Sequence, residues 1–340
     1  MNTASDCHRQ IRQAKSIAII THTRPDTDAI ASSLALKEII LNNYFGKSVH
    51  IFIDENEIGE SNKALISDND LMNHPLTNYD LVITVDCANI DLLGKFGDIF
   101  DKSQNTINID HHATNTDFAQ INYVHNFASA TEVLHHLFEN ELKLKLTKRI
   151  YKLIYAGIVT DTNNEKQNMN STTYELIAFL KENGIETEKI RDFYFNNESM
   201  AKKKLLSNCL ENIVFDDYGR LALMRISRYD MLLTGATDED TLGLVDEALT
   251  LQGVQVAIMI ISLGDRSYKV SLRSRANSKI DVSKIAQKFN GGGHQKMAAF
   301  TYEGNLSEIL NNLFDECRNE MDLYTEEIEQ NIFEDENVKK

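Results

Sequence analysis

The stretch that decides the fold reads SIAIITHTRPDTDAIASSLALKEIILNNY and covers residues 16–44. Four of its first five residues are apolar, as in a buried strand, whereas residues 28–44 have the spacing of a helix. One histidine, His22, and two aspartates, Asp26 and Asp28, lie where the strand gives way to the helix. These groups are costly to bury. Their position directly after a buried strand therefore predicts either a solvated turn or a site for a strongly positive partner.

The same alternation of strands and helices continues through the first half of the chain. Further strands are expected at residues 48–53, 79–86 and 105–110, and helices at 129–142, 147–159 and 171–184. Gly184 is a natural C-terminal stop for the last of these helices. Repeated strand–helix units predict a doubly wound, mainly parallel α/β sheet.

The second half of the chain predicts another, smaller α/β domain. A polar, lysine-bearing helix is expected to connect the two halves. After it, the pattern predicts two strands within 213–227, a helix at 239–251, strands at 254–262 and 267–275, and a helix at 281–289. We therefore divide the chain into a first domain at 1–190, a linker helix at 191–212, a second domain at 213–325 and an acidic tail at 326–340.

Composition excludes several classes of protein. The chain has 340 residues and a net charge of −16, which suits two soluble domains and argues against binding along a long nucleic-acid duplex. A small anionic substrate is still allowed, because a local metal ion can reverse the field. No apolar run of about 18 residues and no signal peptide is found, so we expect no membrane span and a cytoplasmic protein. Four widely spaced cysteines indicate reduced thiols.

Acidic and imidazole side chains gather at the ends of the predicted strands. Asp86 ends the third strand, and Asp110, His111 and His112 end the fourth. Asp161 follows the apolar run AGIV of a predicted helix. In open α/β sheets, ligands bind beyond the carboxyl ends of the strands. We therefore expect these five side chains to lie at one edge of one sheet. His22, Asp26 and Asp28, which follow the first strand, should lie at the same edge.

So many carboxylates cannot stay ionised together without a counter-charge, because like charges repel and burial adds to the cost. Either several of them are protonated or divalent cations lie among them. Carboxylates and imidazoles without cysteine suit manganese, magnesium or iron(II). About six such ligands fit two ions about 3.5–4 Å apart with one bridging carboxylate, an arrangement that clamps the oxygens of a phosphoryl group.

Each residue taken alone has a simpler explanation. Asp28 serves equally well as the N-cap of the helix that begins there. Asp26 could shape a turn, and His112 could be an ordinary hydrogen-bonded histidine. Asp54 also ends a strand, but it has no company in the sequence and we leave it out. The joint pattern, rather than any one residue, predicts the site.

Four motifs carry a resemblance to a known family: THTRPDTDAI, VDCA, NIDHHATN and GIVTDT. In order and spacing they resemble those of the DHH phosphoesterase superfamily. NGGGH at 290–294, with SLRSR upstream at 271–275, resembles the companion DHHA1 substrate-binding domain. The match covers most of the chain and is most similar to the subfamily of nanoRNases and adenosine 3′,5′-bisphosphate (pAp) phosphatases. Relatives of that subfamily hydrolyse linear or cyclic di-adenylate.

The resemblance implies that domain 1–190 is catalytic and binds two divalent metal ions. Mn²⁺ is expected, with Mg²⁺ or Co²⁺ as alternatives. One ion would be bound by His22, Asp26 and Asp86, and the other by Asp28, Asp86, His111 and Asp161. Asp86 would then bridge the pair.

Further roles follow from the same resemblance. Asp110 would orient an imidazole rather than bind a metal, and His112 would contact the scissile phosphate or protonate the leaving oxygen. The second domain would bind the rest of the substrate through Arg273, Ser274, Arg275, Gly291, Gly292, Gly293 and His294. Glycines let backbone N–H groups approach a phosphate, and an arginine fork suits a phosphate or a base. The alternatives are a plain flexible turn and a strand edge defended by charge.

Three departures from the family pattern concern the choice of substrate. Ala31 stands where a glycine is usual, the stretch TNNEKQNMN after Asp161 is atypical, and Met297 and Ala299 replace a common alanine and glycine. No expected metal ligand is lost.

We therefore predict a phosphodiesterase or phosphatase acting by metal-activated water on short RNA, pAp, pApA or cyclic di-AMP. The alternatives are a pyrophosphatase or exopolyphosphatase, or a non-catalytic nucleotide sensor. The sequence leaves the oligomeric state open, and a homodimer is one option because relatives often form dimers.

Overall fold

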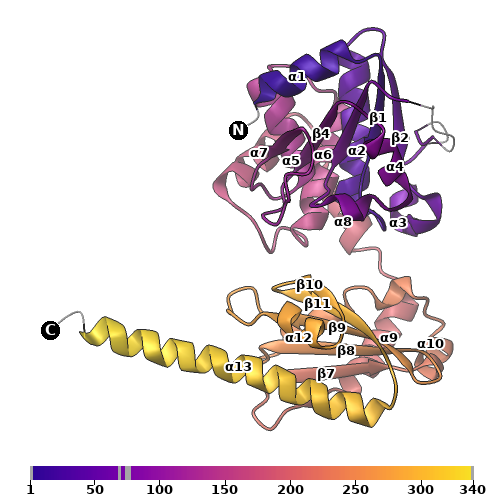
Figure 1. Ribbon diagram of the computed structural model, residues 1–340. Coiled ribbons are helices and arrows are strands. Elements are labelled where there is room, and N and C mark those ends of the chain that lie inside the picture. Colours follow the sequence, from indigo (N-terminus) through magenta and orange to yellow (C-terminus); the bar gives the residue numbers. More distant parts are fainter. Residues whose placement is uncertain (1–2, 68–69, 73–77, 338–340) are drawn as a thin grey trace. The chain divides into compact units, whose positions relative to one another are not determined.

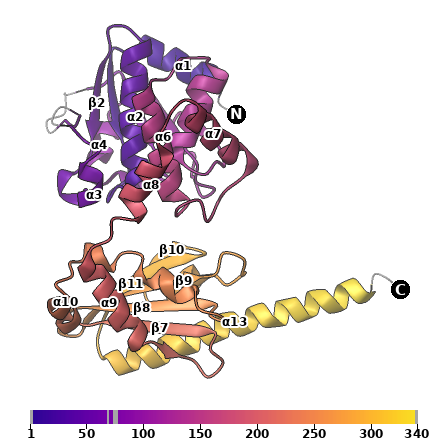
Figure 2. The ribbon, with the colours of Figure 1, turned by 180° about the vertical axis from the view of Figure 1, so that it is seen from behind.

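The structure is a computed structural model, drawn from two sides in Figures 1 and 2. It describes residues 3–67, 70–72 and 78–337, with the side chains of His294 and of residues 322–337 lying outside what is described. The chain forms two compact units, Met1–Asn197 and Glu198–Lys340. Each unit contains its own sheet and its own apolar core.

The first unit contains a five-stranded sheet with the order β2-β1-β3-β4-β5, in which all neighbouring strands are parallel. The strands are β1 (Ser16–Ile20), β2 (Ser48–Phe52), β3 (Leu81–Val85), β4 (Thr106–Asp110) and β5 (Ile121–Val124). The predicted doubly wound sheet is confirmed, although β5 was not predicted. The strand order reverses between β1 and β3, and the crevice at such a switch point is where ligands bind in open α/β sheets.

Helices cover both faces of this sheet. They are α1 (Ala4–Gln13), α2 (Thr27–Asn43), α3 (Glu60–Lys63), α4 (Gly97–Asp101), α5 (Ala130–His135), α6 (Lys148–Asp161), α7 (Ser171–Glu182) and α8 (Thr187–Phe195). Alternate residues of a strand point to opposite faces. Ile17 and Ile19 of β1 pack into the core formed with α1, α2, α5, α6 and α7, and α2 and α6 lie side by side (Figure 2). Ala18 and Ile20 pack on the other face, toward α4.

Helix ends in the first unit follow the predicted ranges with two differences. The predicted helix 129–142 is α5 followed by a π-helical turn, His136–Glu141. Helix α6 continues to Asp161, so this carboxylate lies in the last helical turn rather than after it. Gly184 has a left-handed φ of 75° and lies two residues after the end of α7. It therefore marks the end of this helix, as predicted.

The second unit contains a six-stranded mixed sheet with the order β10-β11-β9-β8-β7-β6. The strands are β6 (Val214–Phe215), β7 (Leu221–Ile226), β8 (Val256–Gly264), β9 (Ser267–Ser274), β10 (Gly292–His294) and β11 (Met297–Glu303). Only β7 and β8 pair in parallel. The helices are α9 (Met200–Glu211), α10 (Arg228–Thr234), α11 (Leu244–Leu249), α12 (Val282–Lys288) and α13 (Leu306–Asn337). One sheet face packs on α12 and α13, and the other on α9 and α11.

Three predictions for the second half need correction. The single linker helix predicted at 191–212 is two helices, α8 and α9, and the boundary between the units falls between them. The helix predicted at 239–251 is shortened to α11, because Gly243 adopts a left-handed φ of 79° just before it. The plain flexible turn considered as the alternative for NGGGH is wrong, since Gly292–His294 forms strand β10, paired with β11.

The predicted acidic tail begins inside α13, which runs to Asn337 and is drawn in yellow in Figure 1. Residues 338–340 of that tail lie outside the described residues. Within the described part of the chain, every helix is too short or too polar to cross a bilayer. All four cysteines are buried and unbridged, as predicted for reduced thiols.

Candidate functional site

The predicted site residues of the first unit converge at the carboxyl ends of β1, β3 and β4. Asp86 directly follows β3, Asp110 is the last residue of β4, and His22 comes two residues after β1. Parallel strands place these ends at the same edge of the sheet, on either side of the switch point between β1 and β3. The loops after the strands therefore bring the motif residues together.

The side chains form three overlapping groups that could hold a cation, each with ligand atoms within 4.8 Å of one another. The groups are His22, Asp26 and Asp86; Asp28, His111 and Asp161; and Asp86, Asp110, His111 and His112. All six predicted metal ligands and both predicted catalytic residues are thus brought together. Which of them bind metal and which act in catalysis remains a prediction.

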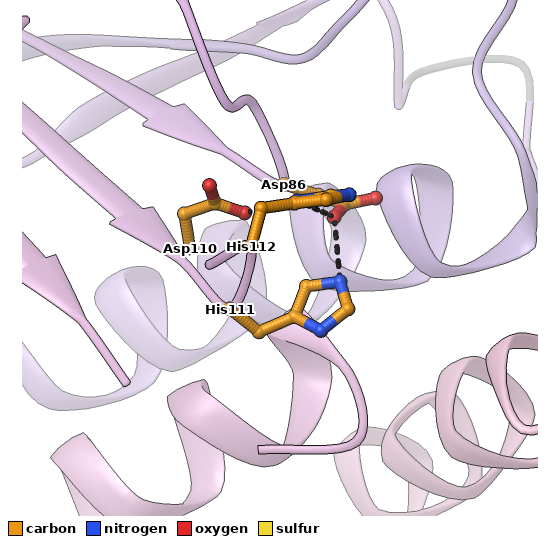
Figure 3. A group of neighbouring side chains, drawn as sticks. All are labelled: Asp86, Asp110, His111 and His112. Atoms are coloured by element: carbon orange, nitrogen blue, oxygen red, sulfur yellow. Dashed lines mark hydrogen bonds and ion pairs between the residues drawn. The ribbon is translucent and has the colours of Figure 1, made fainter. Parts of the chain in front are cut away.

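Asp86 belongs to two of the three groups, and in the one drawn in Figure 3 both His111 and His112 approach its carboxylate. Its carboxylate is 3.6 Å from Nε2 of His22 on one side and 3.4 Å from Nε2 of His111 on the other. The residue is only 2% exposed and has a left-handed φ of 52°, which is uncommon for a residue other than glycine. Backbone strain of this kind is often found where a side chain must be aimed at a functional site.

Hydrogen bonds to backbone carbonyls orient the two histidines beside Asp86. Nδ1 of His22 is 2.8 Å from the Thr23 carbonyl oxygen, and Nδ1 of His111 is 3.2 Å from that of Phe127. A ring that donates from Nδ1 presents Nε2 to the other side, which is the usual arrangement for a metal-binding histidine. Both Nε2 atoms accordingly face the Asp86 carboxylate.

A second network fixes His112. Its Nδ1 is 2.8 Å from Oδ1 of Asp110, whose other oxygen accepts a hydrogen bond of 2.5 Å from the Asn115 side-chain amide. Asp110 is fully buried at the end of β4. The imidazole expected to be oriented by Asp110 is therefore that of His112. Asn115 was missed by sequence reasoning, although it belongs to the quoted motif NIDHHATN.

The two aspartates of the first motif have different local roles. Asp26, not Asp28, is the N-cap of α2, since its side chain accepts a hydrogen bond from the Ala29 N–H. The cap explanation considered for Asp28 is therefore wrong. Asp28 is 1% exposed and accepts hydrogen bonds from the N–H groups of Ala130 (2.6 Å) and Thr131 (3.2 Å) at the start of α5. These donors hold one buried carboxylate in place.

Gly157 of α6 makes room for that carboxylate. A Cβ atom at this position would lie 2.2 Å from Oδ1 of Asp28 and 2.3 Å from Oγ1 of Thr131. No side chain fits at such distances unless the neighbours move. Helix α6 can thus approach α2 and α5 closely only with glycine here. The residue lies in the motif GIVTDT, but sequence reasoning gave it no role because its packing partners are distant in the sequence.

Burial and mutual charge shift the pKa values of the cluster in opposite directions. Burial disfavours the charged form of His22, but its interaction with Asp86 outweighs burial and raises the pKa of His22 to about 9. Burial also disfavours ionisation of Asp86, yet the imidazoles of His111 and His22 hold the pKa of Asp86 far below its usual value. In contrast, burial raises the pKa of Asp161 to about 7, and burial with the Asp86 charge raises the pKa of Asp28 well above its usual value.

The residues of this cluster fit divalent cations. Oδ1 of Asp86 is buried and has no hydrogen-bond partner within the described part of the chain. Nε2 of His111 and Nδ1 of His112 lie 3.4 and 3.6 Å from this oxygen, and imidazole and carboxylate are ligand types that divalent cations bind. A cation among these groups would satisfy the unpaired oxygen and remove the cost of burying several acids.

The predicted substrate residues on β9 are engaged within the second unit. Nε of Arg273 is 3.2 Å from a carboxylate oxygen of Asp246. Arg275 follows the end of β9, and its guanidinium donates to the backbone carbonyls of Val254 and Leu251. Ser274 is buried, and its hydroxyl donates to the carbonyl of Ile280. Their roles in substrate binding remain predictions, and in this structure Arg275 and Ser274 hold the fold of their own unit.

The three glycines of NGGGH differ from one another. A Cβ on Gly291 would lie 2.4 Å from the Ala299 carbonyl oxygen, and one on Gly293 would lie 2.5 Å from Cα of Ala298. These two positions therefore need glycine for close packing against β11. A Cβ on Gly292 would enter open space, with no atom within 4 Å. The side chain of His294, the last predicted contact, lies outside the described residues.

Comparison with known proteins agrees with the geometry. Residues 16–158 match the family model described as DHH family, N-terminal domain, and residues 229–319 match that of the DHHA1 domain. A similar curated protein is the probable bifunctional oligoribonuclease and PAP phosphatase NrnA of Streptococcus mutans, 26% identical over 301 residues that cover 84% of this chain and 89% of that protein.

Two further proteins are similar over most of this chain. The cyclic-di-AMP phosphodiesterase PdeA of Listeria monocytogenes is 24% identical, covering 85% of this chain but 45% of that protein. A solved structure of an exopolyphosphatase-related protein from Bacteroides fragilis has a TM-score of 0.84 at 23% identity, covering 95% of this chain and 97% of that one. This chain therefore contains a DHH-family N-terminal domain at 16–158, followed by a DHHA1 domain at 229–319.

Proposed function

We propose that this chain is a divalent-cation-dependent phosphodiesterase and phosphatase that hydrolyses short oligoribonucleotides, pAp and linear or cyclic di-adenylate. One observation carries the proposal: Asp86 is buried at the switch point of the sheet, with His22 on one side and His111 on the other. The names of the NrnA and PdeA relatives supply the substrate class. The DHHA1 domain after the DHH domain supports the same class, since the similarity to these relatives extends over most of the chain.

The arrangement of donors suits two manganese ions. His22, Asp26 and Asp86 would hold one, while Asp28, Asp86, His111 and Asp161 would hold the other. Such ions would polarise the phosphoryl oxygens and activate a water. The chain itself holds the donors in fixed positions: carbonyl oxygens orient the two imidazoles, and N–H groups of α5 hold Asp28. Preorganised ligands of this kind lower the cost of assembling the site.

His112 is the proposed contact to the scissile phosphate or the donor of a proton to the leaving oxygen. Burial disfavours the charged form of His112, but the Asp110 carboxylate beside Nδ1 outweighs burial and raises the pKa of His112. A raised pKa favours the protonated imidazole, which can stabilise the developing negative charge and donate a proton to the leaving oxygen. Asn115 holds the second oxygen of Asp110, so the carboxylate cannot rotate away from the imidazole.

The net charge of −16 fits small substrates better than long ones. Long nucleic acid is bound mainly by neutralising many phosphates with lysine and arginine. A short nucleotide needs only one phosphate at the metal cluster and a contact to its remainder, which we assign to the DHHA1 domain. We further propose a cytoplasmic enzyme, and homodimerisation remains one option.

Activity on pyrophosphate or polyphosphate is the alternative with a specific observation behind it. The structural neighbour from Bacteroides fragilis, at a TM-score of 0.84, is described as exopolyphosphatase-related. Inorganic polyphosphate offers no base or ribose, so it leaves the assigned role of the DHHA1 domain without a ligand. A non-catalytic nucleotide sensor would be expected to have lost some ligand positions, yet all six are present and brought together.

A substrate panel separates these functions. Phosphate and nucleotide release would be measured with pAp, pApA, cyclic di-AMP, RNA dinucleotides and polyphosphate, with Mn²⁺ and with Mg²⁺. The proposal expects turnover of pAp and short RNA by the wild type, and its loss in His111→Ala. Turnover of polyphosphate alone would show the alternative to be correct, and nucleotide binding without any hydrolysis would indicate a sensor.

A further inference from the structure

A cavity of about 280 Å³ lies in the first unit beside the candidate metal cluster. His22 lines it, together with its chain neighbours Thr21 and Thr23. His22 also belongs to the group formed with Asp26 and Asp86. A molecule with one part at the cluster can therefore place an adjoining part in the cavity. The volume is at the low end for ligand pockets, which begin at about 300 Å³, and suits one ring system rather than a whole dinucleotide.

The walls of the cavity combine apolar and polar residues, and the apolar part includes two aromatic rings. Phe52, at the end of β2, and Leu93 are each 1% exposed and line it together with Phe96. The rings of Phe52 and Phe96 have centroids 5.7 Å apart at an angle of 48°. Phe52 and Leu93 belong to the apolar core behind the cavity, whereas Phe96 is only partly buried and offers the ring surface on which a flat base can stack.

Polar groups line the same cavity. Asp54 forms an ion pair with Lys95, which holds the pKa of Asp54 below its usual value and keeps it an acceptor. Nζ of Lys95 also lies 5.2 Å from the centre of the Phe96 ring. Oε2 of Glu57, another lining residue, accepts a hydrogen bond of 2.8 Å from the Arg24 N–H. Carboxylate oxygens accept hydrogen bonds from exocyclic amino groups, which adenine, guanine and cytosine carry and uracil lacks.

The backbone around the cavity is closely packed. Gly94 has a left-handed φ of 53°, and a Cβ there would lie 2.4 Å from Cγ2 of Thr23. The Thr23 N–H donates to the Leu92 carbonyl oxygen at 2.8 Å. The segment that carries Leu93 and Phe96 is thus fixed directly to the residue after His22. Cavity and metal cluster share one rigid piece of backbone.

We propose that this cavity is a nucleobase subsite, which receives the base of a nucleotide whose phosphate is bound at the metal cluster and favours bases with an amino group. The inference rests on the proposed function, because it requires a nucleotide substrate. It adds a binding role for Asp54, which lies two residues after β2 and is the N-cap of the short 3-10 helix Glu55–Glu57. It also places one determinant of base preference in the DHH domain rather than in the DHHA1 domain.

The test compares RNA dinucleotides that differ only in their bases. Steady-state kinetics would be measured for adenine and uracil dinucleotides and for two abasic analogues of the adenine dinucleotide, each lacking one base. The variants are Phe96→Ala and Asp54→Asn, with Phe45→Ala, a fully exposed phenylalanine, as the matched control. Phe96→Ala is expected to raise KM for the adenine dinucleotide about tenfold, through loss of stacking, with Phe45→Ala unchanged. One of the two abasic analogues should be insensitive to Phe96→Ala.

Asp54→Asn keeps the side-chain volume and provides a test that does not depend on a large change in packing. It is expected to reduce the preference for adenine over uracil at least about threefold, which is within the net contribution of one ordinary hydrogen bond. The proposal would be overturned if Phe96→Ala and Asp54→Asn reduced kcat/KM equally for both dinucleotides and both abasic analogues. It would also be overturned if neither variant changed kcat/KM for any of these four substrates. Failure of the wild type to cleave any dinucleotide would instead count against the proposed function itself.

Discussion

The two units of this chain use their motif residues in different ways. In the DHH unit, residues from His22 to Asp161 converge on Asp86, and the buried Oδ1 of Asp86 has no hydrogen-bond partner in the described structure. In the DHHA1 unit, Arg275 donates to backbone carbonyls and Gly291 packs against β11. A buried carboxylate oxygen without a hydrogen-bond partner calls for a ligand, whereas glycines and arginines have many uses inside a fold. The metal cluster could therefore be inferred more securely than the substrate contacts.

Replacing the central aspartate should have the largest effect. Asp86→Asn keeps the size of the side chain, and asparagine tolerates the left-handed backbone that Asp86 adopts. The change removes the one charge shared by both proposed metal sites. We expect kcat to fall by about a thousandfold or more, since metal ions contribute several kcal/mol to phosphoryl transfer. Initial rates and bound Mn²⁺ measured by elemental analysis would check this.

Asp101→Asn serves as the control, because Asp101 is an exposed acid at the end of α4. It should leave both the rate and the metal content unchanged. If Asp86→Asn kept its manganese and most of its activity, the cluster would not be the catalytic centre, and the contrast between the two units would disappear.

Metal affinity should depend strongly on pH. In the metal-free protein the pKa of His22 is raised to about 9 and that of Asp161 to about 7. Both shifts favour the protonated form in the folded state. Their contribution to stability is therefore fully present below the unfolded values of about 6.5 and 3.9, and it is lost as the pH rises through 9 and 7. Metal binding needs the deprotonated forms, so protons and cations compete.

For each displaced proton, the affinity for Mn²⁺ should fall about tenfold per pH unit below the pKa of its group. For the ion beside His22 we expect a loss of about a hundredfold between pH 8 and pH 6. Calorimetric titration in buffers of different ionisation enthalpy would count the released protons. An affinity that does not change with pH, with no proton release, would mean that these side chains do not bind the metal.

Much of this fold could be predicted because its signals are local. Strands β1 to β4 are short apolar runs, and the acids that follow them mark the ligand-binding edge. Strand β5 was missed because it has only four residues, alternately buried and half-buried. Which of Asp26 and Asp28 caps α2 could not be predicted either. The two differ by two positions, and the choice depends on contacts with α5, about a hundred residues away in the sequence.

Close packing between helices that are far apart in the sequence could not be predicted either. Gly157→Ala tests this. In an open helical position such a change stabilises a protein by about 1 kcal/mol. Here the added methyl would meet Asp28 at 2.2 Å and Thr131 at 2.3 Å. We expect the free energy of unfolding to fall by about 1–3 kcal/mol, as for other overpacked sites.

Displacement of Asp28 should also lower kcat at least about tenfold, as for groups that orient metal ligands. Chemical denaturation and manganese titration would measure the two effects separately. Gly97→Ala is the control, since a Cβ at Gly97 meets no atom within 4 Å. A Gly157→Ala protein as active and as stable as the wild type would show that α6 does not position Asp28.

The smallest expected effect concerns the hairpin formed by β10 and β11 in the DHHA1 unit. Substituting two adjacent glycines there, Gly291 and Gly292, distinguishes a role in packing from a role in substrate binding. Gly291→Ala should lower the melting temperature, because its methyl would contact Ala299 and Phe300 of β11 at 2.4 Å. Gly292→Ala meets nothing in the fold and should leave stability unchanged. If the backbone here approaches a phosphate, that methyl should raise KM for pApA by about threefold to tenfold, the value of one weakened hydrogen bond. An unchanged KM in Gly292→Ala would mean that the glycines of β10 serve packing alone, and the substrate role of this hairpin would have to be abandoned.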